Sequence, residues 1–147
     1  SGRMDIALKM VLNETFPSFK NWMDRGATTL WECWNGEGSQ NHHMFSDIIA
    51  SMYKYIGGIR PDETEPGFRR IVMRPSVDCG LRSVKASHES PFGKIVSNWT
   101  LDSDSIQLDV QVPGGSTATL ELPSGIVEGD YPATLPPGTH HINVTTT

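Results

Sequence analysis

The chain has 147 residues, a length that suits one ordinary domain or two small ones. Hydrophobic residues make up 37% of it and charged residues 20%, as in globular proteins. No apolar run approaches the roughly 20 residues that a membrane-spanning helix needs. Seventeen acidic residues against twelve Lys and Arg give a formal net charge of −5. This composition excludes a membrane-spanning helix, and without a dense basic patch nucleic acid is not an expected partner.

The first helix is predicted over residues 4–12 from its mixed apolar pattern. Pro17 is predicted in the first turn of a second helix, which ends near Gly26. A third helix is predicted from Asn41, as N-cap, to Ile56, where Gly57 and Gly58 end it. Its broad apolar stripe consists of Met44, Phe45, Ile48, Ile49, Met52, Tyr53 and Ile56.

After Gly58 the apolar residues recur with a period near two, and turn signals separate short segments. Strands are predicted over residues 68–74, 82–88, 94–101, 105–112, 117–122 and 140–145. Short strands with this spacing indicate an antiparallel β-sandwich. The fold class is therefore α+β in two segments, with helices over residues 1–58 and a β-sandwich over residues 59–147.

The helical segment looks incomplete, because a helix with so wide an apolar stripe normally has neighbours on more than one side. One interpretation is that these helices belong to a larger helical body. The other is a small helical bundle that docks on the sandwich. Ser1 to Met4 resemble an expression scar before an internal segment and show no signal peptide, so the compartment is left open.

The candidate chemistry lies in the loop before the third helix, where Glu32, Glu37 and His42 accompany Trp31 and Trp34. Carboxylates framed by indole rings suit carbohydrate, because sugar C–H faces pack on aromatic rings and a carboxylate activates water. His42, in the first helical turn, would face the positive end of the helix dipole and stay neutral. The simpler interpretation from spacing alone is that both tryptophans are core and the polar residues are solvated or cap the helix.

No metal or cofactor is predicted. Cys33, His42 and His43 offer three nominal ligands, but their spacing is not that of a structural zinc site. Cys33 and Cys79 stand in different contexts, which favours two free thiols. His140 and His141 fit the solvent-facing alternation of a terminal strand.

Residues 26–34 (GATTLWECW) and 39–42 (SQNH) resemble the end of the catalytic domain of bacterial α-L-rhamnosidases, glycoside hydrolase family 78. Residues 65–75 (EPGFRRIVMRP), 90–95 (SPFGKI) and 137–140 (PGTH) are similar to segments of that family's C-terminal β-domain. The resemblance covers nearly the whole chain. It departs from the family pattern at Cys33, where arginine is common, and in a shorter loop from Glu32 to His42.

The resemblance implies a partial set of helices from an (α/α)6 barrel followed by a β-sandwich. It also implies inverting hydrolysis of terminal α-linked L-rhamnose, which needs two carboxyl groups about 6.5–9.5 Å apart. By the motif, Glu32 matches the general base and His42 a sugar-binding histidine, while Trp31 and Trp34 fall in the aromatic surroundings of the sugar. The general acid lies on an earlier motif that nothing here matches.

We therefore expect the C-terminal portion of an α-L-rhamnosidase-like glycoside hydrolase, inactive alone. Its expected partners are a rhamnose-containing glycan and the missing N-terminal part of the same protein. Self-association through uncovered helix faces is also expected. The alternative is a non-catalytic carbohydrate-binding or structural β-sandwich with a helical adaptor, and a third possibility is a degenerate relative without activity.

Overall fold

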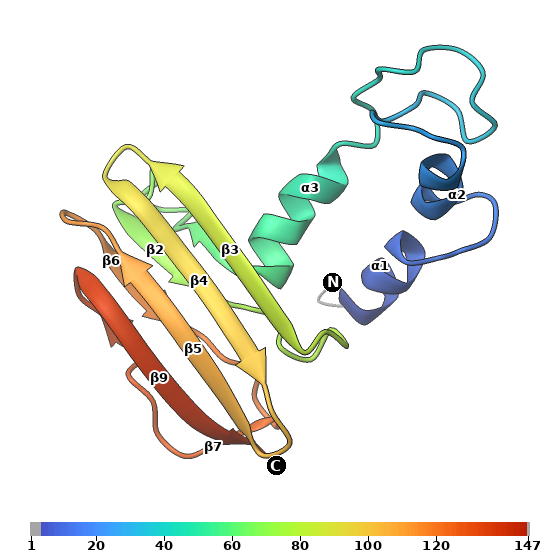
Figure 1. Ribbon diagram of the computed structural model, residues 1–147. Coiled ribbons are helices and arrows are strands. Elements are labelled where there is room, and N and C mark those ends of the chain that lie inside the picture. Colours follow the sequence, from blue (N-terminus) through green and yellow to red (C-terminus); the bar gives the residue numbers. More distant parts are fainter. Residues whose placement is uncertain (1–3, 147) are drawn as a thin grey trace. The chain divides into compact units, whose positions relative to one another are not determined.

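The computed structural model describes residues 4–146, and the chain divides into two compact units between Ser51 and Met52 (Figure 1). The helical unit contains α1 (Met4–Val11), α2 (Phe19–Asp24) and α3 (Asp47–Ser51). The β unit begins with a π-helical turn, η1 (Met52–Ile56), and continues into strands β1 to β9. No helix within residues 4–146 combines the length and apolarity needed to cross a membrane.

The first two helices form where they were predicted, with one correction. Ser18 is the N-cap of α2, and its hydroxyl oxygen accepts a hydrogen bond from the backbone N–H of Asn21 at 3.0 Å. Pro17 therefore precedes the cap, and its predicted place in the first helical turn is wrong. The reason is that a serine hydroxyl satisfies a free donor of the first turn, which the neighbouring Pro17 and Phe16 cannot do.

The third helix begins later than predicted, because α3 starts at Asp47 and not after Asn41. The backbone N–H of His42 donates to the carbonyl of Leu30 at 2.8 Å, and the N–H of Ser46 donates to the carbonyl of His43 at 2.9 Å. Residues 41–46 are thus committed to a cross-loop bond and a turn. Asn41 is not an N-cap, and His42 does not lie in a helical turn.

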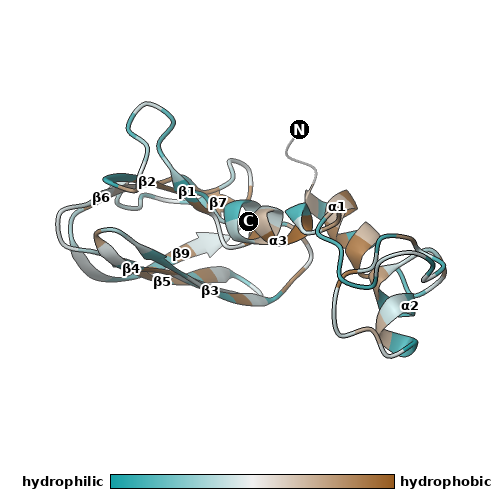
Figure 2. Ribbon diagram, turned by 90° about the horizontal axis from the view of Figure 1, so that it is seen from above, coloured by the Kyte–Doolittle hydropathy of each residue, from teal (hydrophilic) through white to brown (hydrophobic). Residues whose placement is uncertain are grey.

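Two sheets form the β unit. The first has four strands, in the order β1 (Ile59–Pro61), β2 (Arg70–Met73), β6 (Thr117–Leu120) and β8 (Thr134–Leu135). The second has five, in the order β3 (Ser83–Ser90), β4 (Gly93–Leu101), β5 (Ser105–Val112), β9 (Gly138–Thr146) and β7 (Val127–Glu128). Seen from above, the two sheets lie as separate layers (Figure 2).

The predicted strands are all present, and β5 has the predicted bounds. The short strands β1, β7 and β8 were not predicted. All neighbouring strands pair antiparallel except β2 and β6, which run parallel with Arg70 opposite Thr117 and Met73 opposite Leu120. The prediction of helices followed by an antiparallel β-sandwich is therefore confirmed with one parallel pair. A parallel pair needs a long crossover connection, and β3, β4 and β5 of the other sheet lie within that connection.

The core of the β unit lies between the two sheets. In β5, Ile106, Leu108 and Val110 are at most 2% exposed, whereas Gln107 and Asp109 between them are exposed. Leu108 pairs with Trp99 of β4 on one side and with Ile142 of β9 on the other. Burying each large apolar side chain stabilises the fold by about 1.5–3 kcal/mol.

The end of η1 is bound tightly to the sheets, and this explains the two glycines better than helix termination alone. The Ser97 hydroxyl donates to the carbonyl of Gly57 at 2.6 Å, and the indole N–H of Trp99 donates to the carbonyl of Ile56 at 3.0 Å. A Cβ on Gly58, whose φ is +71°, would lie 2.2 Å from the backbone nitrogen of Pro75. The predicted helix end is confirmed, and close packing adds a second requirement for glycine.

Candidate functional site

The loop of residues 26–46 rests on an aromatic cluster within the helical unit. Trp22 of α2 is the centre of the cluster, at 2% exposure, and its ring stacks on that of Trp34 with 4.5 Å between centroids. The indole N–H of Trp22 donates to the carbonyl of Trp34 at 3.0 Å. Phe19 and Phe45 complete the cluster with edge-on and tilted contacts. Aromatic pairs of this kind contribute about 0.5–1.5 kcal/mol each beyond their burial, so the cluster holds the loop in one conformation.

Trp31 packs inside the same unit and is only 6% exposed. The guanidinium of Arg25 lies over its ring, 5.0 Å from the centroid, and also donates to the carbonyl of Asn35 at 2.8 Å. A Cβ on Gly36, whose φ is +83°, would lie 2.8 Å from the Trp31 ring. Trp31 therefore packs on the inner side of its own loop, whereas Trp34 is half-buried.

Glu32 points its carboxylate at the far side of the loop. Its Oε2 accepts a hydrogen bond from the backbone N–H of Ser39 at 2.9 Å, and its own N–H donates to the carbonyl of Ser39 at 2.8 Å. A Cβ on Gly38, whose φ is +76°, would lie 2.7 Å from Oε2. The side chain is 41% exposed, so the carboxylate is oriented by the backbone and still reaches solvent.

His42 lies beside this carboxylate, with 3.9 Å between its Nδ1 and Oε2 of Glu32. That separation is too long for a direct hydrogen bond. The ring of His42 is parallel to that of His43, with centroids 5.5 Å apart. The predicted position of His42 at the start of a helix, facing its dipole, is wrong, because no helix begins there.

The structure brings Glu32 and His42 together, whereas Trp31 is buried and Trp34 is half-buried against Trp22. Glu37 is exposed, and its backbone N–H donates to the side-chain oxygen of Asn35 at 3.1 Å. Sequence reasoning missed Arg25 and the backbone of Ser39. The signal for Ser39 was Gly38, because a glycine beside a carboxylate often marks a close approach of backbone.

Among residues 4–146, no three or more His, Cys, Asp or Glu side chains are grouped to hold a metal ion. Cys33 is an exposed free thiol on the loop, and Cys79 is a buried free thiol in the β unit. His140 contacts the carbonyl of Pro136 at 2.8 Å, and His141 pairs with Asp109 at 2.6 Å.

Two family models match this chain. The bacterial alpha-L-rhamnosidase 6 hairpin glycosidase domain matches residues 1–56, and the bacterial alpha-L-rhamnosidase C-terminal domain matches residues 58–130.

Proteins with similar sequences are alpha-L-rhamnosidases. An alpha-L-rhamnosidase of Formosa agariphila is 34% identical over 84% of this chain and 14% of its own length. One of Streptomyces avermitilis is 30% identical over 84% of this chain and 13% of its own length. The chain thus spans about one seventh of the length of these relatives.

Solved structures of alpha-L-rhamnosidases are also similar to this chain. The Streptomyces avermitilis alpha-L-rhamnosidase complexed with L-rhamnose superposes with a TM-score of 0.79 at 26% identity, over 97% of this chain and 16% of that one. The Aspergillus terreus enzyme superposes with a TM-score of 0.80 at 26% identity, over 95% of this chain and 17% of that one. The two domain matches lie next to each other along the chain, and the relatives match across most of it. This protein therefore belongs to the bacterial α-L-rhamnosidase family.

Proposed function

We propose that this chain carries one wall of the active site of an inverting α-L-rhamnosidase, together with the β-sandwich that follows it. The observation that carries the proposal is the carboxylate of Glu32, which is held by the N–H of Ser39 and is still 41% exposed. The backbone bond orients one carboxylate oxygen, and the exposure of the side chain leaves the other accessible to a water molecule.

In the proposed reaction Glu32 is the general base. In an inverting hydrolysis the base takes a proton from water as the water attacks the anomeric carbon, while an acid protonates the leaving oxygen on the opposite face. Ser39 fixes the direction of one carboxylate oxygen, which leaves the other for the attacking water. His42, at 3.9 Å and partly exposed, is placed to donate or accept a hydrogen bond to a sugar hydroxyl.

Trp31 and Trp34 act on this site through the loop. Because Trp31 is buried beneath Arg25, we assign it to the positioning of Glu32 and not to stacking on the sugar. Trp34 is half-buried and packs one side against Trp22. The domain assignment follows the same proposal, with residues 1–58 as part of a helical catalytic barrel and residues 59–147 as the β-domain.

The general acid is expected from another part of the parent protein, so we propose that the 147-residue chain alone is inactive. General acid–base steps contribute about 10²–10⁴-fold each, and loss of one partner removes that factor. Turnover of an aryl α-L-rhamnoside by the isolated chain, at a rate near that of the parent protein, would contradict this.

The decisive experiment is Glu32→Gln in the longer parent protein. We expect the turnover number to fall by about 10²–10⁴-fold, because glutamine keeps the shape of the side chain but cannot take a proton. Binding of L-rhamnose, measured by calorimetry, should stay within a few-fold. Glu37→Gln is the matched control on the same loop and should leave turnover unchanged.

The competing function is a non-catalytic sugar-binding or structural module. The burial of Trp31 and the packing of Trp34 favour it, since both were expected to face a sugar in an active site. The same two variants separate the alternatives. Turnover unchanged by Glu32→Gln refutes the catalytic role, and no turnover of any rhamnoside by the parent protein indicates a degenerate relative.

A further inference from the structure

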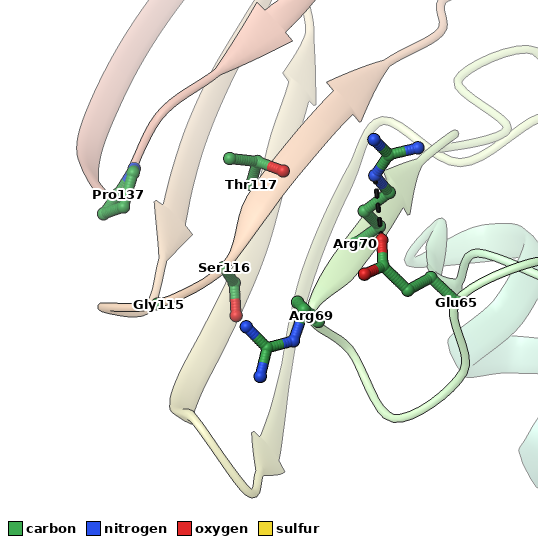
Figure 3. Close-up of a pocket in the computed structure, with 7 residues that line it drawn as sticks. All are labelled: Glu65, Arg69, Arg70, Gly115, Ser116, Thr117 and Pro137. Atoms are coloured by element: carbon green, nitrogen blue, oxygen red, sulfur yellow. Dashed lines mark ion pairs between the residues drawn. The ribbon is translucent and has the colours of Figure 1, made fainter.

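A second candidate site lies in the β unit, in a pocket of about 350 Å³ that we call the Arg69 pocket. It opens where the segments before β2, before β6 and before β9 meet (Figure 3). Its lining residues are Glu65, Arg69, Arg70, Gly115, Ser116, Thr117 and Pro137. The volume falls at the lower end of the range for small-molecule sites, and it is far larger than a single bound ion requires.

The pocket is positively charged in a protein whose formal net charge is −5. Of its two guanidinium groups, that of Arg70 is neutralised by Glu65 at 2.9 Å (Figure 3). Within residues 4–146, no acidic side chain forms an ion pair with Arg69. Arg69 therefore offers an uncompensated charge with planar donors, which suits a carboxylate or sulfate oxyanion.

Arg69 is held in place by a strained and well-supported backbone. Phe68, the residue before it, has a φ of +67°, which is unusual for a bulky side chain. The hydroxyl of Ser116 donates to the carbonyl of Phe68 at 2.8 Å, and the N–H of Thr117 donates to the carbonyl of Arg69 at 3.0 Å. Such strain persists only where the surroundings enforce it, and it is concentrated at ligand sites.

The side chain of Arg69 is positioned as well. Its guanidinium lies over the ring of Phe92, 5.2 Å from the centroid. Gly115 lies near the same ring, and an added Cβ there would be 3.4 Å from it. Figure 3 shows the guanidinium of Arg69 beside the hydroxyl of Ser116, with Thr117 and Pro137 across the opening. A cation on an aromatic ring, flanked by a hydroxyl and an apolar ring, can hold both the charge and the carbon skeleton of a ligand.

We propose that the Arg69 pocket binds an acidic sugar unit through its carboxylate or sulfate group. Arg69 binds the oxyanion, Thr117 bonds a ring hydroxyl, and Pro137 contacts the sugar ring. That the ligand is a sugar rests on the proposed function, whereas the anion site rests on the pocket alone. The parent protein would then recognise a charged unit of the glycan at a site separate from the one that cleaves rhamnose.

The test is an NMR titration of the ¹⁵N-labelled 147-residue chain with glucuronate, glucose and inorganic sulfate. We expect saturable shifts at the residues of the pocket with glucuronate, none with glucose, and weaker binding of sulfate. Arg69→Gln should raise the dissociation constant for glucuronate by about tenfold or more, because a charge-assisted hydrogen bond is lost. Arg69→Lys keeps the charge but loses the planar guanidinium group. Its dissociation constant for glucuronate should lie between those of the unaltered chain and Arg69→Gln.

Arg82→Gln is the matched control, since Arg82 is an exposed arginine outside the pocket. Binding that is unchanged in Arg69→Gln, or shifts that map elsewhere, would overturn the proposal. Sulfate that binds as tightly as glucuronate would overturn the sugar part and leave a simple anion site. Glu32→Gln should bind glucuronate as the unaltered chain does, so failure of the catalytic proposal is distinguishable from failure of this one.

Discussion

The helical unit and the β unit differ in how completely they cover their large apolar side chains. Among residues 4–146, the clearly exposed large hydrophobic side chains lie in the helical unit, except for Met52, Tyr53 and Tyr55 of η1 at the start of the β unit. Met10 is 70% exposed, Met23 61% and Met44 58%. In the β unit beyond η1, by contrast, side chains such as Met73 and Ile106 are fully buried.

This difference indicates which part of the chain is self-sufficient. The β unit pairs its own strands and closes its own core between two sheets. The helices bury an aromatic cluster and leave other apolar side chains to solvent. Since the chain spans about one seventh of its relatives, we expect the rest of the parent protein to cover those side chains.

Trp99→Ala should have the largest effect on the β unit. Trp99 is 1% exposed and its indole N–H is bonded to the carbonyl of Ile56, so truncation leaves a cavity and an unpaired carbonyl. The free energy of unfolding, measured by urea denaturation with far-UV circular dichroism, should fall by about 3–5 kcal/mol. Thr100→Ala, at the exposed neighbour in the same strand, should change it by no more than about 0.5 kcal/mol. Similar effects of the two variants would contradict a closed core.

Gly58→Ala comes next. The added Cβ meets the backbone of Pro75 and the φ of +71° disfavours alanine, so we expect a loss of about 2–3 kcal/mol. Gly125→Ala shares a positive φ, +90°, but meets no atom within 4 Å. It should cost only about 1 kcal/mol in the same denaturation experiment. Equal losses would mean that conformation alone, and not close packing against Arg74 and Pro75, requires the glycine at position 58.

Self-association of the isolated chain should depend on the helical unit. Met44 and Ile49 are 58% and 52% exposed, and we expect such side chains to form contacts between copies. Replacing both by lysine should weaken association by about tenfold, or about 1.4 kcal/mol, in analytical ultracentrifugation. Replacing the already polar Lys85 and Thr100, exposed in the β unit, by glutamine should have no effect. A monomer at high concentration, before any substitution, would contradict the expectation.

The smallest effect concerns acid stability. The hydroxyl and the backbone N–H of Thr64 both donate hydrogen bonds to the carboxylate of Asp62. These bonds, the hydroxyl's first, lower the pKa of Asp62 below the ordinary aspartate value. Because the pKa is lowered on folding, the contribution to stability is present above the unfolded pKa and is lost as the pH falls through the folded one. Thr64→Val should therefore destabilise the chain slightly at neutral pH and not at strongly acid pH. Thermal midpoints measured across this range will check the sign.

Local patterns anticipated most elements of the fold. The strict alternation of residues 105–112 predicted β5 with its bounds, because one buried face leaves a period of two in the sequence. The apolar stripe after residue 43 predicted a helix but placed its start too early. Nothing within that stretch indicates that the backbone N–H of His42 donates a hydrogen bond to the carbonyl of Leu30.

The candidate site, like the fold, could be predicted from the sequence only in part. Glu32 and His42 were identified from their motif, and the structure brings them within 4 Å. Their sequence could not reveal that Trp31 lies under Arg25, or that the backbone of Ser39 orients the carboxylate. These contacts depend on how the loop closes upon itself, which the spacing of residue types does not encode.

Periodicity and short motifs are local, so the residues alone were enough to predict the three helices, the six longer strands, the family and the loop that carries Glu32. The parallel pairing of β2 with β6, the burial of Trp31 and the pocket around Arg69 became visible only in three dimensions. The strand pairing and the pocket depend on segments that are far apart in the chain, and Trp31 is buried by the way its own loop packs against α2. Their contacts are selected by the packing of the whole unit, which no single stretch of residues specifies.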